Sequence, residues 1–113
     1  MNMKLPALLA RRQPDAYKNE FGHVCVLAGS AKMLGAAALT SLAAMRAGAG
    51  LVTAAVPASL NAAAQKKISN VAMTLPLKET REQTVAAEAF VQIHRKYDQF
   101  DVLAIGPGLS RHP

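Results

Sequence analysis

A length of 113 residues suits a single domain, and a hydrophobic content of 51% excludes an intrinsically disordered chain. The net charge of +6 favours an anionic partner, and the whole excess of basic residues lies within residues 1–67. These basic residues are scattered and lack the interleaved aromatic pattern that single-strand binding needs, so the sequence predicts no nucleic-acid binding.

Cys25 is the single cysteine and lies inside an apolar run, which excludes a disulfide framework and predicts a buried, inert thiol. No metal-ligand spacing is present, so the chain is expected to hold no metal of its own. The longest apolar helical stretch, residues 33–45, is too short to span a membrane. These features predict a soluble, cytoplasmic protein with no membrane partner.

Residues 1–22 are expected to form an irregular lead-in to a domain over residues 23–113. A nearly continuous apolar run at residues 23–28 predicts a strand buried on both faces. A loop leads from it into an alanine-rich helix that begins at Gly35 or Ala36. Gly48 is the predicted stop of this helix.

A second strand is predicted at residues 51–56, and Ser59 is expected to cap a short helix after it. A third strand is predicted at residues 71–75, closed by Pro76. Residues 80–83 have the pattern of a capping box. They predict a third helix whose apolar stripe comprises Ala86, Phe90, Ile93 and Tyr97.

A fourth strand is predicted at residues 102–105, with an apolar pattern typical of burial on both faces. No helix follows it before residue 113, so its apolar faces are expected to be exposed in this chain. Because exposed edges and apolar patches pair with other chains, the sequence predicts a homo-oligomer. The expectation is that the 113 residues are the N-terminal portion of a larger domain.

The alternation of strands and helices predicts an α/β fold with a mainly parallel sheet, whose ligands bind outside the carboxyl ends of the strands. Two glycine-bearing loops follow such ends, at residues 29–36 and 106–110. If the first and fourth strands are neighbours, the two loops face each other beside a helix N-terminus suited to phosphate. The candidate phosphate or loop contacts are Gly29, Ser30, Lys32 and Gly106. The alternative is that these glycines only let the backbone turn.

Known nucleotide motifs do not fit these loops. Five residues separate Gly29 from Gly35, one more than the Walker A spacing, and no Lys-Ser or Lys-Thr follows. The pair Gly48 and Gly50 precedes a strand, whereas a dinucleotide fingerprint follows one. No catalytic His, Ser or carboxylate arrangement can be assigned from the spacing.

Five segments resemble, in their order along the chain, a known enzyme family. They are Phe-Gly-His-Val, Leu-Ala-Gly-Ser, Met-Leu-Gly-Ala-Ala, Arg-Ala-Gly-Ala-Gly-Leu-Val-Thr and Ala-Ile-Gly-Pro-Gly-Leu, at residues 21–24, 27–30, 33–37, 46–53 and 104–109. Together they resemble the N-terminal part of the ADP/ATP-dependent NAD(P)H-hydrate dehydratases, once described as YjeF-related carbohydrate kinases. The resemblance implies a three-layer, ribokinase-like α/β fold.

The resemblance also implies an activity. The family uses ADP or ATP, with Mg²⁺, to phosphorylate the ring hydroxyl of hydrated NADH or NADPH. Loss of phosphate then restores the cofactor. Carried over residue by residue, the positions implied to bind the hydrate are Gly35, Ala36 and Gly108. Alternatives are a small-molecule kinase of the ribokinase-like superfamily, acting on a carbohydrate or vitamin, and a non-catalytic anion-binding module.

The chain departs from the family pattern in several places. The usual Ser-His-Lys-Gly before the first strand keeps only its lysine, Lys18, and the usual Gly-Pro-Gly-Leu-Gly ends in Ser110. The family's His-Pro-Gly-Glu segment and its loop with the catalytic aspartate are absent from the 113 residues. The resemblance therefore implies no catalytic residue within this chain, which is expected to be inactive by itself.

Overall fold

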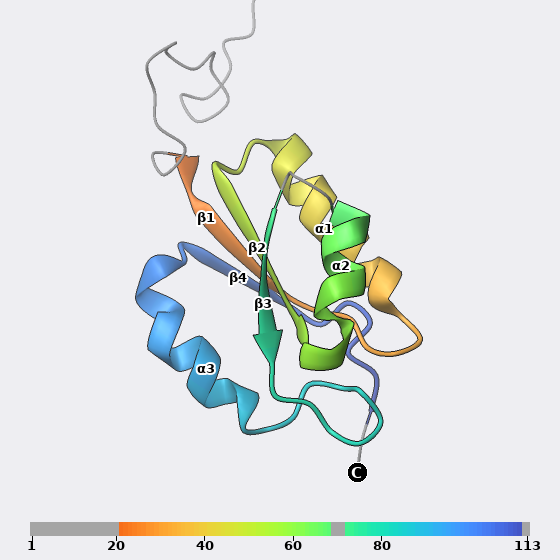
Figure 1. The fold of residues 1–113 in the computed structure, drawn as a ribbon. Coiled ribbons are helices and arrows are strands. Elements are labelled where there is room, and N and C mark those ends of the chain that lie inside the picture. The colour runs from red at the N-terminus through yellow and green to blue at the C-terminus, as the bar shows by residue number, and fades with distance from the viewer. Residues whose placement is uncertain (1–20, 69–71, 112–113) are drawn as a thin grey trace, which may run out of the picture.

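The computed structural model describes residues 21–68 and 72–111 (Figure 1). Most of the predicted lead-in at residues 1–22 lies outside these ranges, as does Val71, the predicted start of the third strand. The strands and helices are, in chain order, β1 (His23–Leu27), α1 (Leu34–Ala47), β2 (Leu51–Pro57), η3 (Ala58–Leu60), α2 (Asn61–Ile68), β3 (Met73–Leu77), α3 (Ala89–Lys96), η4 (Tyr97–Gln99) and β4 (Val102–Ile105).

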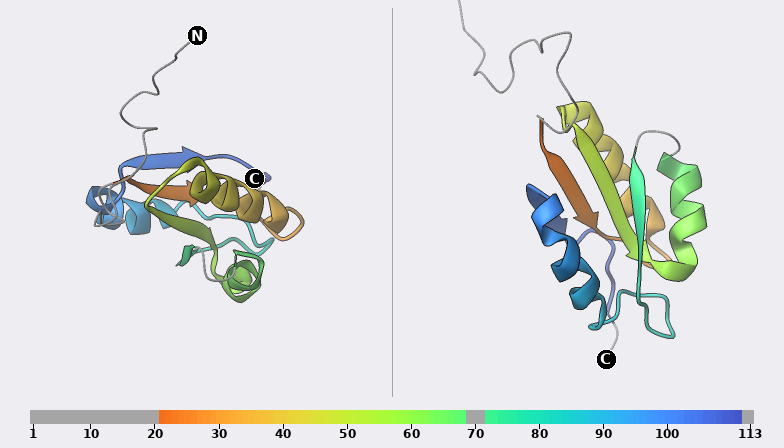
Figure 2. Two further views of the ribbon diagram at one scale, coloured as in Figure 1. Left: turned by 90° about the horizontal axis from the view of Figure 1, so that it is seen from above. Right: turned by 60° about the vertical axis from the view of Figure 1, so that its left-hand side comes forward.

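The four strands form one parallel sheet in the order β3-β2-β1-β4. Helices α1 and α2 cover one face and α3 covers the other, which gives three layers (Figures 1 and 2). The predicted α/β architecture with a parallel sheet is confirmed. The arrangement follows from the sequence because consecutive parallel strands need a helical crossover between them.

The core is built from small and branched side chains. On the α1 and α2 face, Val26, Val52 and Val56 pack with the alanines of the sheet and of both helices. Because alanine side chains are small, α1 can lie close to the sheet, and the core is filled without large aromatic side chains. At its end, α1 terminates in the left-handed Gly48, with φ of 112° and an N–H bonded to Met45 O at 3.2 Å. The predicted helix stop is confirmed.

Cys25 lies on the α3 face of β1 and is fully buried with Ala55, Leu77 and Ile93. Burial raises the pKa of its thiol to about 11. A thiol with such a pKa stays protonated at neutral pH and is a poor nucleophile. The predicted burial of the cysteine is confirmed.

The third strand is displaced from its predicted position. Strand β3 runs from Met73 to Leu77, so Pro76 lies inside it and pairs with Val56 of β2. The prediction that Pro76 closes the strand is wrong. Proline fits here because β3 is at the edge of the sheet, where a missing N–H can face away from the neighbouring strand.

The helix starts predicted at Ser59 and Thr80 are also wrong. Ser59 lies inside η3, and its hydroxyl donates to Glu79 Oε2 at 2.8 Å instead of capping α2. Thr80 shares a 2.7 Å hydrogen bond with the hydroxyl of Thr84, within a turn. Helix α3 begins only at Ala89. At Ser59 the predicted cap gives way to a contact with a residue distant in sequence. At Thr80 it gives way to a bond within the local turn.

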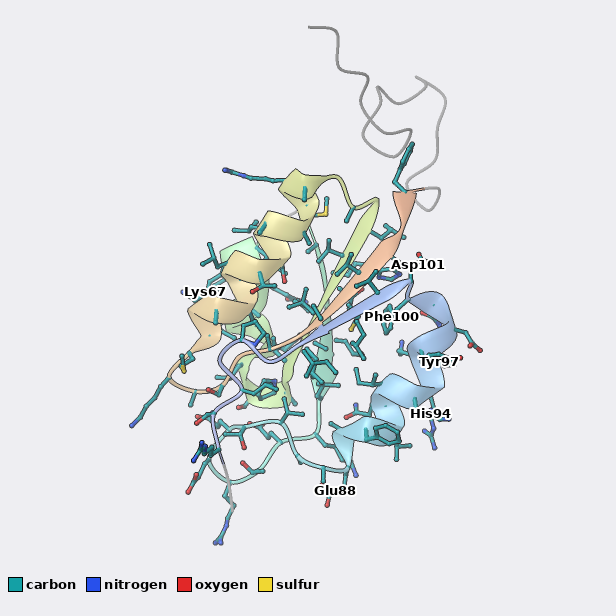
Figure 3. The ribbon with its side chains drawn as sticks, turned by 180° about the vertical axis from the view of Figure 1, so that it is seen from behind. Lys67, Glu88, His94, Tyr97, Phe100 and Asp101 are labelled. Carbon is teal, nitrogen blue, oxygen red and sulfur yellow. The ribbon has the colours of Figure 1, made fainter. Side chains whose placement is uncertain are left out.

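The apolar stripe predicted for the third helix is only partly correct. Ala89 and Ile93 form the buried face, whereas Phe90 and Tyr97 are 71% and 62% exposed. Phe90, His94 and Tyr97 stack in sequence on the outer surface of α3. Figure 3 shows His94 and Tyr97 pointing away from the sheet. The late start of the helix at Ala89 places a different set of residues against the sheet.

Strand β4 is exposed on both faces, as expected. Val102, Leu103 and Ile105 are 54%, 42% and 58% exposed. In the described ranges of the chain, β4 pairs with β1 alone and is an edge of the sheet.

No helix within residues 21–68 and 72–111 is long and apolar enough to cross a bilayer.

We expect the protein to associate in solution through β4, because an apolar strand with a free edge pairs with other chains. Light scattering at micromolar concentration should show a species larger than the monomer. The double variant Val102→Lys/Leu103→Lys should shift the population towards monomer, since it places a charge on each face of the strand. Phe90→Lys is the control, because it replaces an apolar side chain on α3 that is more exposed, at 71%. A monodisperse monomer of the unaltered protein would contradict this expectation.

Candidate functional site

The predicted ligand loops lie side by side at the carboxyl edge of the sheet, at the lower end of the view in Figure 1. We call residues 28–33 the β1 loop and residues 106–110 the β4 loop. Strands β1 and β4 are parallel neighbours with Leu27 opposite Ile105. The Gly29 N–H donates to Pro107 O at 2.9 Å, and the Gly106 N–H donates to Leu27 O at 3.2 Å. The prediction that these two loops face each other is confirmed.

The β4 loop is a tight turn that packs against the start of α1. The Leu109 N–H donates to Gly106 O at 3.2 Å, with Pro107 and Gly108 at the turn centre. Gly108 has φ of +70°, as the third position of a type II turn requires. A Cβ added at Gly108 would lie 2.8 Å from Met33 O and 3.0 Å from Ala36 Cβ. Packing alone therefore requires glycine at this position.

Gly35 lies in the first turn of α1 and differs from Gly108 in its surroundings. No heavy atom outside its chain neighbours and its own helix backbone lies within 4 Å of the position that a Cβ would take. Its φ also lies outside the range that disfavours side chains. The fold does not require glycine at residue 35. Gly35 is exposed, and the position of its absent side chain is open.

The N-terminus of α1 is suited to an anion. Its N-cap residue Met33 makes no side-chain capping bond, and the first turn contains no acidic residue. The first N–H groups of an α-helix have no partner inside the helix and carry partial positive charge. Lys32 is exposed immediately before this terminus. The local electrostatics therefore favour a negatively charged group.

Ser30 is the one side chain of the β1 loop that is both polar and buried. Its residue is 2% exposed, and its hydroxyl has no hydrogen-bond partner in the described part of the chain. Its carbonyl accepts from the Met33 N–H at 3.0 Å, which closes the turn that leads into α1. Gly29, just before it, has φ of +88° and would bring a Cβ to 3.1 Å from Ala37 Cβ. The β1 loop is thus closely packed on its inner side.

A third loop reaches this edge of the sheet and was not predicted. Residues 78–88, the β3 loop, fold back so that Gln83 O accepts the Ala31 N–H at 3.2 Å. The Gln83 side-chain amide donates to Ser59 Oγ at 2.7 Å. The available signal was the pair Thr80 and Thr84 flanking a polar run, which is compatible with a turn as well as with a helix cap.

His23 and Asp101 do not lie at this edge. His23 lies at the opposite end of β1, where its Nε2 is 2.7 Å from Thr53 Oγ1 and its backbone N–H donates to Asp101 Oδ2 at 2.7 Å. Figure 3 places Asp101 with Phe100 at that amino end of β4. Residues 21–68 and 72–111 contain no group of three His, Cys, Asp or Glu side chains that could hold a metal ion. The β1 and β4 loops supply backbone groups and the cation of Lys32, and the β3 loop carries charges of both signs.

Known proteins match the chain over almost its full length. The family model described as NAD(P)H-hydrate dehydratase matches residues 24–113. A bifunctional NAD(P)H-hydrate repair enzyme of Moorella thermoacetica is 41% identical over 105 residues, which cover 93% of this chain and 20% of that protein. An ADP-dependent (S)-NAD(P)H-hydrate dehydratase of Listeria monocytogenes is 28% identical over 92% of this chain and 34% of its own length. The chain thus spans about a fifth to a third of these relatives.

The fold has solved relatives as well. A ribokinase-like superfamily protein of Enterococcus faecalis superposes with a TM-score of 0.70 at 27% identity, over 90% of this chain and 32% of that one. A Streptococcus mutans protein superposes with a TM-score of 0.67 at 27% identity, over 93% of this chain and 34% of that one. On the match over residues 24–113, together with this fold, the chain belongs to the NAD(P)H-hydrate dehydratase family.

Proposed function

We propose that the protein acts in the nucleotide-dependent dehydration of hydrated NADH or NADPH, and that this chain supplies loops that hold the hydrate. Gly35 and Ala36 at the start of α1 and Gly108 in the β4 loop are the proposed contacts. The observation that carries the proposal is the open space at Gly35, together with Gly108, where an added Cβ would lie 3.0 Å from Ala36 Cβ. The loops can thereby present a close backbone surface to a ligand.

The carboxyl edge of the sheet favours anions, and the proposed substrate carries phosphate groups. The N-terminus of α1 and the cation of Lys32 favour negative charge. The N–H groups of Gly29 and Gly106 are already bonded to Pro107 O and Leu27 O, so these two glycines are proposed to shape the loops. The unpartnered hydroxyl of Ser30 adds a donor beside that terminus. These residues are proposed to orient the hydrate through its phosphates and leave its ring accessible to the nucleotide.

The chemical step needs groups that the described residues do not bring together. Phosphorylation of the ring hydroxyl by ADP or ATP with Mg²⁺ calls for a base and for carboxylate ligands to the metal. The described ranges contain no such cluster and do not fit a magnesium site. We therefore expect the 113-residue chain alone to leave the hydrate unconverted in the presence of ADP or ATP and Mg²⁺, as followed by NADH absorbance. Conversion of the hydrate by this chain would contradict the expectation.

Calorimetric titration tests the proposed function directly. The protein is titrated with NADPH hydrate, with NADH hydrate and, as controls, with intact NADPH and with ADP. If the proposal is right, a hydrate binds and the binding saturates. We also propose that the protein acts in the cytoplasm, where NADH and NADPH are used. Equal binding of all four compounds would indicate a general anion site. No binding of either hydrate would overturn the proposal.

A further inference from the structure

Gln83 lies at the tip of a firmly bonded turn in the β3 loop. Glu79 and Val85 form an antiparallel bridge across the base of the turn. The Thr80 N–H donates to Thr84 O at 2.9 Å, and the Gln83 N–H donates to Thr80 O at 3.1 Å. These bonds close the turn and place Gln83 at its tip, and contacts outside the turn decide where the tip is held.

The backbone of Gln83 adopts a conformation that side chains rarely take. Its φ is 59°, in the left-handed region, and Ser110 is the one other non-glycine residue of the described ranges with a positive φ. Strain of this kind persists where the surrounding structure over-determines it, and it clusters at functional sites. Glycine would adopt this φ more readily, but it would lack the contribution that the glutamine side chain makes.

Two hydrogen bonds show what that contribution is. The Gln83 carbonyl accepts the Ala31 N–H of the β1 loop at 3.2 Å. The Gln83 side-chain amide donates to Ser59 Oγ at 2.7 Å, and Ser59 donates through both its hydroxyl and its N–H to the Glu79 carboxylate, at 2.8 and 2.9 Å. The side chain thus anchors the turn on η3, directly after β2, and the carbonyl bonds the β1 loop.

The β1 loop is consequently held from two sides. The Gly29 N–H is bonded to the β4 loop and the Ala31 N–H to the β3 loop. The unpartnered Ser30 hydroxyl lies between these two attachments, and Lys32 and the N-terminus of α1 follow directly. A loop fixed on both sides presents its ligand-binding groups without an ordering cost on binding.

We propose that Gln83 is a positioning residue for the hydrate site: it holds the β1 loop through Ala31 and thereby sets the affinity for hydrated NAD(P)H. This inference rests on the function proposed above. Gln83 does not contact the reacting atoms in this account. Its carbonyl fixes the loop, and its side chain fixes the carbonyl.

The test compares three variants of the full chain by calorimetric titration with NADPH hydrate. Gln83→Gly permits the same backbone conformation and removes the side-chain bond to Ser59. Ser59→Ala removes the other partner of that bond, together with the 2.8 Å bond of the hydroxyl to Glu79 Oε2. Each should weaken binding about three- to tenfold, the range expected for loss of one hydrogen bond. The double variant should bind no more weakly than the stronger single effect, because both changes break the same bond. Gln65→Ala is the matched control, since it removes the 3.0 Å bond that the Gln65 amide on α2 donates to Thr74 Oγ1 on β3, and it should leave affinity unchanged.

Amide hydrogen exchange supplies a readout that a general loss of stability would not produce. In Gln83→Gly and Ser59→Ala the Ala31 amide should exchange faster, while the β2 amides bonded within the sheet keep their protection. Unchanged affinity and unchanged Ala31 exchange in both variants, with an unaltered protein that binds the hydrate, would overturn the role of Gln83 and leave the proposed function standing. An unaltered protein that fails to bind the hydrate would overturn both.

Discussion

Replacing Gly108 by valine is expected to weaken hydrate binding at least tenfold, or about 1.4 kcal/mol, and to destabilise the fold as well. The added Cβ would meet Met33 O at 2.8 Å and Met33 Cβ at 2.9 Å. The residue would also have to keep φ of +70°. Together, the steric overlap and the backbone strain should cost about 2–4 kcal/mol of the free energy of unfolding. Urea unfolding measures the second effect, and calorimetry at a temperature well below the transition measures the first.

Gly22→Ala separates strain from site geometry. Gly22 also has a positive φ, 89°, but it lies at the amino end of the sheet and its Cβ would come no closer than 3.9 Å to Asp101. This variant should lose about 1 kcal/mol of stability and keep its affinity. If Gly108→Val binds the hydrate as tightly as the unaltered protein, the β4 loop is a structural turn and no part of the site.

Gly35→Val is expected to lower hydrate affinity at least tenfold while the fold stays intact. The space around Gly35 is open, so a side chain fits without overlap. In a helix, valine costs no more than glycine does, so the free energy of unfolding should change by less than about 0.5 kcal/mol. The new side chain would fill space that we assign to the ligand. Calorimetric titration and urea unfolding measure the two quantities on the same sample.

Ala43→Val is the control for this change. Ala43 is an exposed residue of the same helix, in the interior of α1 and away from the loops. Valine there adds similar bulk with no effect expected on binding. A Gly35→Val protein that keeps both its stability and its affinity would show that the open space at Gly35 is not where the hydrate binds.

Elements with strong local signals could be predicted from the sequence. The apolar run before Gly29 predicts β1 because a parallel strand covered on both faces needs no polar alternation. Gly48 predicts the end of α1, since its left-handed φ is disfavoured for other residues. If β1 and β4 are placed side by side, the β1 and β4 loops must meet, because both follow the carboxyl ends of parallel strands.

The β3 loop could not be predicted in the same way. Thr80 precedes a polar segment that is compatible with a helix cap, yet its hydroxyl bonds Thr84, and the loop reaches Ala31 and Ser59 across the sheet edge. Ala31 and Ser59 are more than twenty residues from Gln83 in the sequence, so no local sequence pattern predicts these contacts. Pro76 was misplaced for a related reason: its effect depends on whether β3 is an edge strand, which is a property of the whole sheet.

Chemical-shift mapping of backbone amides with NADPH hydrate tests the central claim most directly, because it locates the ligand as well as detecting it. The account predicts saturable shifts that are largest at Gly35, Ala36 and Gly108, with smaller shifts at Lys32 and Gly29. Intact NADPH should produce weaker shifts at the same amides. Shifts confined to the amino end of the sheet around His23 and Asp101, or the absence of saturable shifts, would contradict a hydrate site between the β1 and β4 loops.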